Sequence, residues 1–177
     1  MLKILGIVFL ILMVYQPSSI YSFQVAAANG GIIDFSNYEH KRILIVNTAT
    51  GCTLTSQFAE LQQLQDSNAS NLVVIAFPSN SFGSEPMSNA GLQSYLTSTY
   101  NISFPIAAKV SVNDATGAIA PLYHWLASKE ENGKMQIKVG GNFDKYLIDK
   151  QGNLIGYFDS TVTPLSAVMQ AALSAHQ

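Results

Sequence analysis

The chain has 177 residues, of which 48% are hydrophobic and 11% are charged, and its formal net charge is −2. This length suits one domain with a sizeable core. The few basic residues form no block, which argues against nucleic acid and anionic membrane surfaces as partners.

The amino terminus has the pattern of a secretory signal peptide. Lys3 precedes an apolar run from Ile4 to Tyr15, and Pro17 and small residues follow. The run is shorter than the roughly 20 apolar residues that span a bilayer. We expect a signal peptide over residues 1–28, cleaved between about residues 22 and 28, and a mature domain over 29–177. An uncleaved anchor helix is the alternative.

If this segment is cleaved, the protein reaches an exported compartment, and no stable membrane span remains. It would be secreted, periplasmic or in the lumen of the secretory pathway. The absence of a cysteine near the segment excludes a lipid-anchored lipoprotein.

The first half of the domain alternates strand and helix. After a Gly-rich lead-in with at most a short hairpin, the apolar run over 42–47 predicts a buried strand. Apolar residues at Leu54, Phe58, Leu61 and Leu64 predict a helix. A second buried strand is expected over 72–77, and then a helix that Asn89 caps and that runs to about Thr99.

The second half predicts an extended piece over 104–106, a short helix over 121–128 and a hairpin. The hairpin strands, 145–149 and 154–158, flank Gly152, which tolerates the positive φ of a turn. A final helix is expected from Pro164. A parallel pair followed by an antiparallel pair predicts an α/β, thioredoxin-like three-layer fold, with a mixed central sheet and helices on both faces.

Cys52 is the only cysteine, so the chain forms no internal disulfide. It follows the first strand and lies near the expected amino end of a helix, where free N–H groups and the helix dipole favour the thiolate. The thiolate is the nucleophilic form. The alternative is a buried, inert apolar residue.

Several segments, in matching order from about Lys41 to Pro164, resemble the glutathione peroxidases, particularly secreted or endoplasmic-reticulum members of the cysteine type. The family pattern N-V-A-S-x-C-G-x-T corresponds here to Asn47-Thr48-Ala49-Thr50-Gly51-Cys52-Thr53-Leu54-Thr55. The pattern F-P-C-N-Q-F-G corresponds to Phe77-Pro78-Ser79-Asn80-Ser81-Phe82-Gly83, and W-N-F-x-K-F-L-V-D to Gly141-Asn142-Phe143-Asp144-Lys145-Tyr146-Leu147-Ile148-Asp149. The resemblance implies the thioredoxin-like fold.

The resemblance also implies a catalytic set of a Cys or selenocysteine, a Gln, a Trp and an Asn. Cys52 and Asn142 match, whereas Ser81 stands at the Gln position and Gly141 at the Trp position. Cys52 would then attack the peroxide, Asn142 would orient the sulfur and bind the peroxide, and Ser81 would be a partial stand-in donor. Without the resemblance, Asn142 would be interpreted as a turn residue.

The implied function is an exported, cysteine-dependent peroxidase that reduces hydrogen peroxide or organic hydroperoxides and defends against oxidative stress. With one thiol, it needs an external reductant: glutathione, a thioredoxin-like protein or a thiol-disulfide oxidoreductase. No cofactor or metal is expected, because His40, His124 and His176 are isolated in the sequence. The alternative is a weakly active or inactive redox sensor or binding protein that acts through Cys52.

Overall fold

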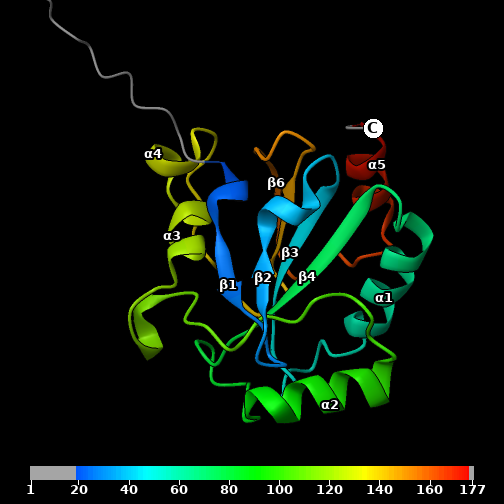
Figure 1. The fold of residues 1–177 in the computed structure, drawn as a ribbon, viewed down its shortest axis with the longest axis vertical. Helices are drawn as coiled ribbons and strands as arrows, with labels where there is room; N and C mark the ends of the chain where they lie inside the picture. Colours follow the sequence, from blue (N-terminus) through cyan, green and yellow to red (C-terminus); the bar gives the residue numbers. More distant parts are fainter. Residues whose placement is uncertain (1–18, 176–177) are drawn as a thin grey trace, which may run out of the picture.

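The computed structural model describes residues 19–175, so the apolar run of the expected signal peptide lies outside the described residues. Two antiparallel strands come first, and a four-stranded sheet with five helices follows (Figure 1). The strands are β1 Gln24–Ala26, β2 Ile32–Asp34, β3 Arg42–Thr48, β4 Leu72–Pro78, β5 Lys145–Ile148 and β6 Leu154–Phe158. The helices are α1 Gln57–Asn68, α2 Asn89–Tyr100, α3 Pro121–Ala127, α4 Lys129–Asn132 and α5 Ala167–Ala175, with short 3₁₀-helices at Ile20–Ser22, Phe35–Tyr38 and Asp114–Thr116.

The central sheet has the strand order β4-β3-β5-β6. β3 pairs in parallel with β4 and antiparallel with β5, and β5 pairs antiparallel with β6. β3 and β4 are buried along their whole length, which explains why their sequences show long apolar runs instead of alternation. The predicted thioredoxin-like layout with its mixed sheet is confirmed.

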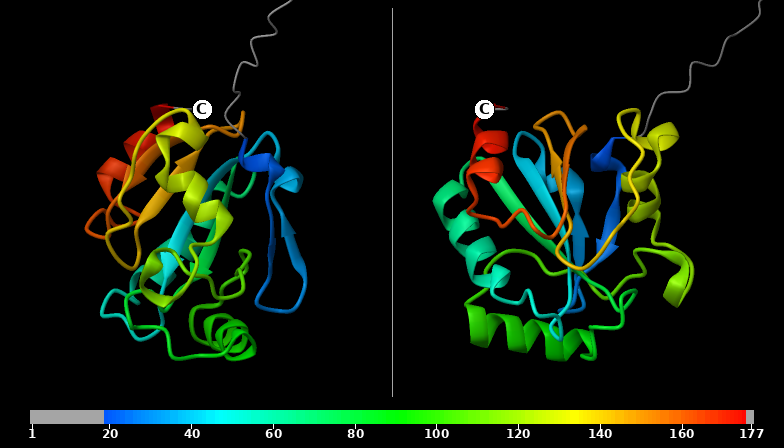
Figure 2. Two further views of the ribbon diagram at one scale, coloured as in Figure 1. Left: turned by 90° about the vertical axis from the view of Figure 1, so that its left-hand side faces the viewer. Right: turned by 180° about the vertical axis from the view of Figure 1, so that it is seen from behind.

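The sheet separates two apolar clusters. Ile43 and Ile45 of β3 face a cluster that includes α3 and the β1–β2 hairpin, whereas Leu44 and Val46 face a cluster that includes α1 and α5. Figures 1 and 2 show these layers on opposite sides of the central strands. Part of one outer layer is therefore a hairpin instead of a helix.

The amino-terminal edge of the folded domain lies before the boundary that we expected at residues 22–28. Ile20 is fully buried, and its N–H donates to the Gly152 carbonyl at 3.3 Å. Ala28 N–H donates to the Ile106 carbonyl at 2.9 Å. Cleavage after residue 22 or 28 would remove Ile20 from the core, and cleavage after residue 28 would also remove β1.

Three helix termini differ from the expectation. α1 begins at Gln57, because residues 51–56 form turns, although the helical spacing extends back to Leu54. α2 is capped by Ser88, whose hydroxyl accepts from Gly91 N–H at 3.2 Å. α5 begins at Ala167 instead of Pro164. Within residues 19–175, no helix has the length and apolar character needed to cross a membrane.

Candidate functional site

Three loops meet at the sheet edge where β3 and β4 end. The parallel pairing brings the ends of both strands together, and Ser79 N–H donates to the Thr48 carbonyl at 2.9 Å. β5 runs the opposite way, so the segment that precedes it reaches the same edge: Phe143 N–H donates to the Asn47 carbonyl at 2.6 Å. This edge lies at the lower end of the sheet in Figure 1. It gathers the segments that carry Cys52, Ser81 and Asn142.

Cys52 lies in the turn between β3 and α1. Its thiol is free and half-buried, and it packs against the apolar cluster that contains Phe58 and Phe143. Cys52 precedes α1, as expected, but α1 begins five residues later, at Gln57, so the thiol lies farther from the helix amino end than the sequence pattern indicated. The effect of the helix dipole is confined to the first turn, so we do not assign the activation of the thiol to it.

The loop over residues 79–87 holds the Cys52 turn. The buried Glu85 carboxylate accepts from Thr50 N–H and from the Thr50 hydroxyl, both at 2.8 Å, and from Met87 N–H at 2.9 Å. Gly51 N–H donates to the Ser84 carbonyl at 2.8 Å, and a Cβ at Gly51 would come within 2.8 Å of that oxygen. Only glycine allows this close approach.

Asn142 is 8% exposed, and its Oδ1 has no hydrogen-bond partner among the described residues. Its neighbour Phe143 has φ +66°, which is unusual for a bulky residue and marks local strain. The ring of Phe143 is fully buried and meets Phe58 edge-on, with 5.1 Å between the ring centroids. A strained backbone conformation thus follows a buried amide whose oxygen has no hydrogen-bond partner among the described residues.

Ser81 is hydrogen-bonded to a residue on the α3 side of the sheet, opposite the side on which Cys52 packs. Its hydroxyl accepts from Val112 N–H at 3.1 Å and from the Ser79 hydroxyl at 3.0 Å. Val112 belongs to the apolar cluster on the α3 side, whereas Cys52 packs against the cluster on the α1 side. These two bonds fix the position of the Ser81 oxygen on the α3 side of the sheet.

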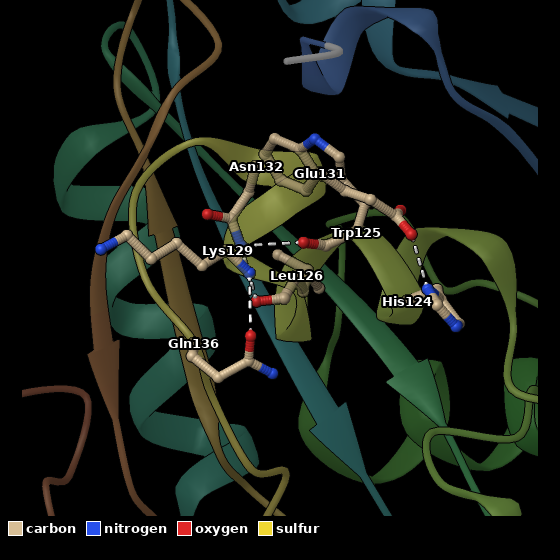
Figure 3. Close-up of polar contacts among 7 residues, drawn as sticks. All are labelled: His124, Trp125, Leu126, Lys129, Glu131, Asn132 and Gln136. Atoms are coloured by element: carbon tan, nitrogen blue, oxygen red, sulfur yellow. Dashed lines mark hydrogen bonds and ion pairs between the residues drawn. The ribbon is translucent and has the colours of Figure 1, made fainter. Parts of the chain in front are cut away.

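Gly141 leaves space, because a Cβ placed there would meet no atom within 4 Å. The adjoining Gly140 lines a hollow of about 950 Å³, which Phe82, Ile119 and Val139 also line. The corner between α3 and α4 forms part of the wall of this hollow, through residues such as His124 (Figure 3). The His124 Nδ1 and Glu131 Oε1 atoms lie 2.7 Å apart. The Asn132 side-chain amide donates to the Trp125 and Leu126 carbonyls.

Lys145 is a fully buried cation close to this edge. It pairs with Val46 and lies on the same face of the sheet, and its Nζ donates to the Phe143 carbonyl at 2.8 Å. Burial lowers the pKa of Lys145 to about 8, against the opposing attraction of Asp144, Asp159 and Glu60. Within residues 19–175, no cluster of three or more His, Cys, Asp or Glu side chains could bind a metal ion.

Comparisons with known proteins identify the family of this chain. A family model described as glutathione peroxidase matches residues 20–127. The chain belongs to the glutathione peroxidase family.

Two curated relatives show how far the likeness extends. The chain is 40% identical over 154 residues to a probable phospholipid hydroperoxide glutathione peroxidase of Citrus sinensis. The match covers 85% of this chain and 90% of the relative. It is 37% identical, with the same coverage, to a glutathione peroxidase-like peroxiredoxin of Candida albicans. An apo crystal structure of a protein named Trgpx is 30% identical, with a TM-score of 0.67, and the match covers 90% of this chain and 95% of that one.

The chain is therefore a thiol peroxidase of the glutathione peroxidase type. The family takes its electrons from a thiol co-substrate, glutathione or thioredoxin, and not from a bound cofactor.

Sequence analysis did not find two residues that organise the site, Glu85 and Asp144. Both are buried carboxylates that accept hydrogen bonds from backbone N–H groups of the site loops. The sequence signal for Asp144 was its carboxylate close to Gly140-Gly141-Asn142. This local signal does not identify its hydrogen-bond partner Tyr157, because Tyr157 lies on β6.

Proposed function

We propose that this protein is an exported peroxidase in which Cys52 reduces hydrogen peroxide or organic hydroperoxides as a defence against oxidative stress. The observation that carries the proposal is the shared sheet edge, to which the fold brings the segments of a half-buried free thiol, Cys52, and of the buried amide of Asn142. The signal-peptide pattern over the first residues supports export.

The Cys52 thiolate attacks one oxygen of the hydroperoxide, and the O–O bond breaks. Sulfur is oxidised to the sulfenic acid Cys–SOH, and the leaving oxygen takes a proton and departs as an alcohol or water. The Asn142 amide supplies a donor for the peroxide and for the charge that grows on the leaving oxygen. Bound water is the best proton source, because the Thr50 hydroxyl already donates to Glu85.

An external thiol then reduces the sulfenic acid. The first thiol displaces water and forms a mixed disulfide with Cys52, and a second thiol releases Cys52 as a thiol. Glutathione, a thioredoxin-like protein and a thiol-disulfide oxidoreductase are the candidate reductants. Because the chain has one cysteine, each mixed disulfide is intermolecular.

A turnover assay tests this function. The mature protein should consume hydrogen peroxide or cumene hydroperoxide with glutathione or with a thioredoxin system, and Cys52→Ser should abolish the activity. Dimedone should label Cys52 after peroxide treatment, as measured by mass spectrometry. Turnover that persists in Cys52→Ser would contradict the assignment.

A redox sensor or binding protein that acts through Cys52 is the second candidate. Ser81 and Gly141 replace two of the family's donors, and the Ser81 hydroxyl is bonded to Val112. Losing one preorganised donor costs about 2.7–4 kcal/mol of transition-state stabilisation. Such a protein would form a lasting mixed disulfide with its partner, without steady turnover.

A further inference from the structure

The segment before Asn142 lacks the side chains that would fix its conformation. Gly140 and Gly141 precede the amide, and glycine has the largest conformational freedom of all residues. The amide itself contributes no fixed bond through Oδ1. Another group therefore has to hold this segment if Asn142 is to keep one orientation.

The buried carboxylate of Asp144 provides this hold. Its Oδ2 accepts from Gly140 N–H at 2.8 Å, from Gly141 N–H at 3.1 Å and from the Tyr157 hydroxyl at 2.8 Å. Asp144 is 2% exposed, and hydrogen bonds to a buried ionised acceptor are stronger than neutral ones. One oxygen thus ties two residues of the loop to strand β6.

Asn47 at the end of β3 holds the same segment from the other side. Its side-chain amide donates to the Gly141 carbonyl, its carbonyl accepts from Phe143 N–H, and its own N–H donates to the Asp144 carbonyl at 3.2 Å. Asn142 is therefore enclosed by backbone bonds on both flanks. The left-handed conformation of Phe143 persists because these bonds surround it.

We propose that Asp144, anchored by Tyr157, is a positioning residue that sets the orientation of the Asn142 amide in the peroxidase site. The carboxylate does with hydrogen bonds what a bulky side chain before Asn142 would do by packing. Its catalytic consequence rests on the proposed role of Asn142 in peroxide reduction.

The Asn142 side-chain amide signals in a ¹H–¹⁵N spectrum give a readout that is independent of activity. Their loss in Asn142→Ala assigns them. Asp144→Ala should shift or broaden these signals, and Tyr157→Phe should do so more weakly. The matched control is Asp149→Ala, because Asp149 also accepts from two backbone N–H groups of a turn, Gln151 at 2.9 Å and Asn153 at 2.8 Å, but beyond the other end of β5.

The rate of Cys52 oxidation by hydrogen peroxide gives the second readout. Misplacing a reacting group by about 1 Å can cost about 100-fold, so we expect Asp144→Ala to slow oxidation by about 10- to 100-fold. Asp144→Asn keeps an acceptor oxygen and should be slowed less. If Asp144→Ala does not fold, Asp144→Asn and Tyr157→Phe carry both readouts.

Coupling distinguishes positioning from general stability. Adding the Asp144 variant to Asn142→Ala should cause no further slowing, because the positioned group is already absent. Losses that multiply, or amide signals that stay unchanged in the Asp144 variants, would overturn the inference. If folded wild-type Cys52 reacts no faster than an unfolded thiol, the proposed function fails, and the amide signals still decide whether Asp144 positions Asn142.

Discussion

Glu85 accepts two hydrogen bonds from Thr50, one from its backbone N–H and one from its hydroxyl, both at 2.8 Å. Thr50 lies two residues before Cys52, and Glu85 is buried in the loop that follows β4. This pair joins the turn that carries the thiol to the neighbouring loop, so the position of Cys52 depends on a residue that is distant in sequence.

Glu85→Ala should destabilise the protein, because three buried or half-buried donors lose their acceptor. Each unsatisfied donor costs about 1–3 kcal/mol, so we expect a loss of at least about 2 kcal/mol in the free energy of unfolding. Urea denaturation measures it, with the exposed Glu39→Ala as control. Equal midpoints for the two variants would contradict the account.

Ser81→Ala should affect stability more than chemistry. The substitution leaves Val112 N–H and the Ser79 hydroxyl without their partner, at a cost of about 1–3 kcal/mol. The rate of Cys52 oxidation should fall less than in Asn142→Ala. A larger loss of rate in Ser81→Ala than in Asn142→Ala would establish Ser81 as the main donor.

Gly141→Trp should discriminate between substrates. A side chain at this position enters open space, whereas one at Gly140 would lie 3.4 Å from Asp144 Oδ2. If the space next to Gly141 admits bulky hydroperoxides, the tryptophan should lower turnover of a lipid hydroperoxide more than turnover of hydrogen peroxide. An equal effect on both substrates would refute this selectivity.

Lys145→Met should raise stability at neutral pH. Burial lowers the folded-state pKa of Lys145 to about 8, below the ordinary value of 10.5, so the unfolded chain binds more protons between these pH values. The lysine thus disfavours folding below about pH 8, by on the order of 3 kcal/mol, and this cost disappears as the pH rises to about 10.5. Urea denaturation at pH 7 and pH 10 should show the advantage of Lys145→Met shrinking; a constant difference would contradict the assignment.

The amino-terminal boundary can be tested by truncation. A chain that begins at Ser19 keeps Ile20 and β1, whereas a chain that begins at Asn29 loses both. Removing one buried large aliphatic side chain costs about 2–5 kcal/mol, so the shorter chain should melt at a clearly lower temperature. Equal melting temperatures would support cleavage as late as residue 28.

The central sheet could be predicted because its strands carry their own signal. The buried runs over 42–47 and 72–77 and the turn at Gly152 match β3, β4 and the β5–β6 hairpin. The start of α1 could not be found from periodicity, because Leu54 packs against the same cluster as Phe58 while its backbone is still in a turn. Ile20 was missed because an apolar residue after a signal-like run carries no mark of its burial in a distant core.

The candidate site, like the fold, could be predicted only in part. Cys52 and Asn142 were found from local motifs, and the structure brings their segments to one edge of the sheet. The support from Glu85 and Asp144 could not be predicted, because it consists of bonds to backbone groups that only the fold brings close. Ser81 was expected to be a partial stand-in donor, and the structure adds a structural role, because its hydroxyl accepts from Ser79 and Val112.

The most direct test of the central claim is stopped-flow oxidation of the reduced mature protein by hydrogen peroxide, with the sulfenic acid trapped at Cys52. The control is the same protein unfolded, with both rates corrected to equal thiolate fraction. The account predicts that the folded protein reacts much faster, because the fold orients the sulfur and supplies a donor for the peroxide. Equal corrected rates would contradict it and would leave Cys52 as a site for binding a partner.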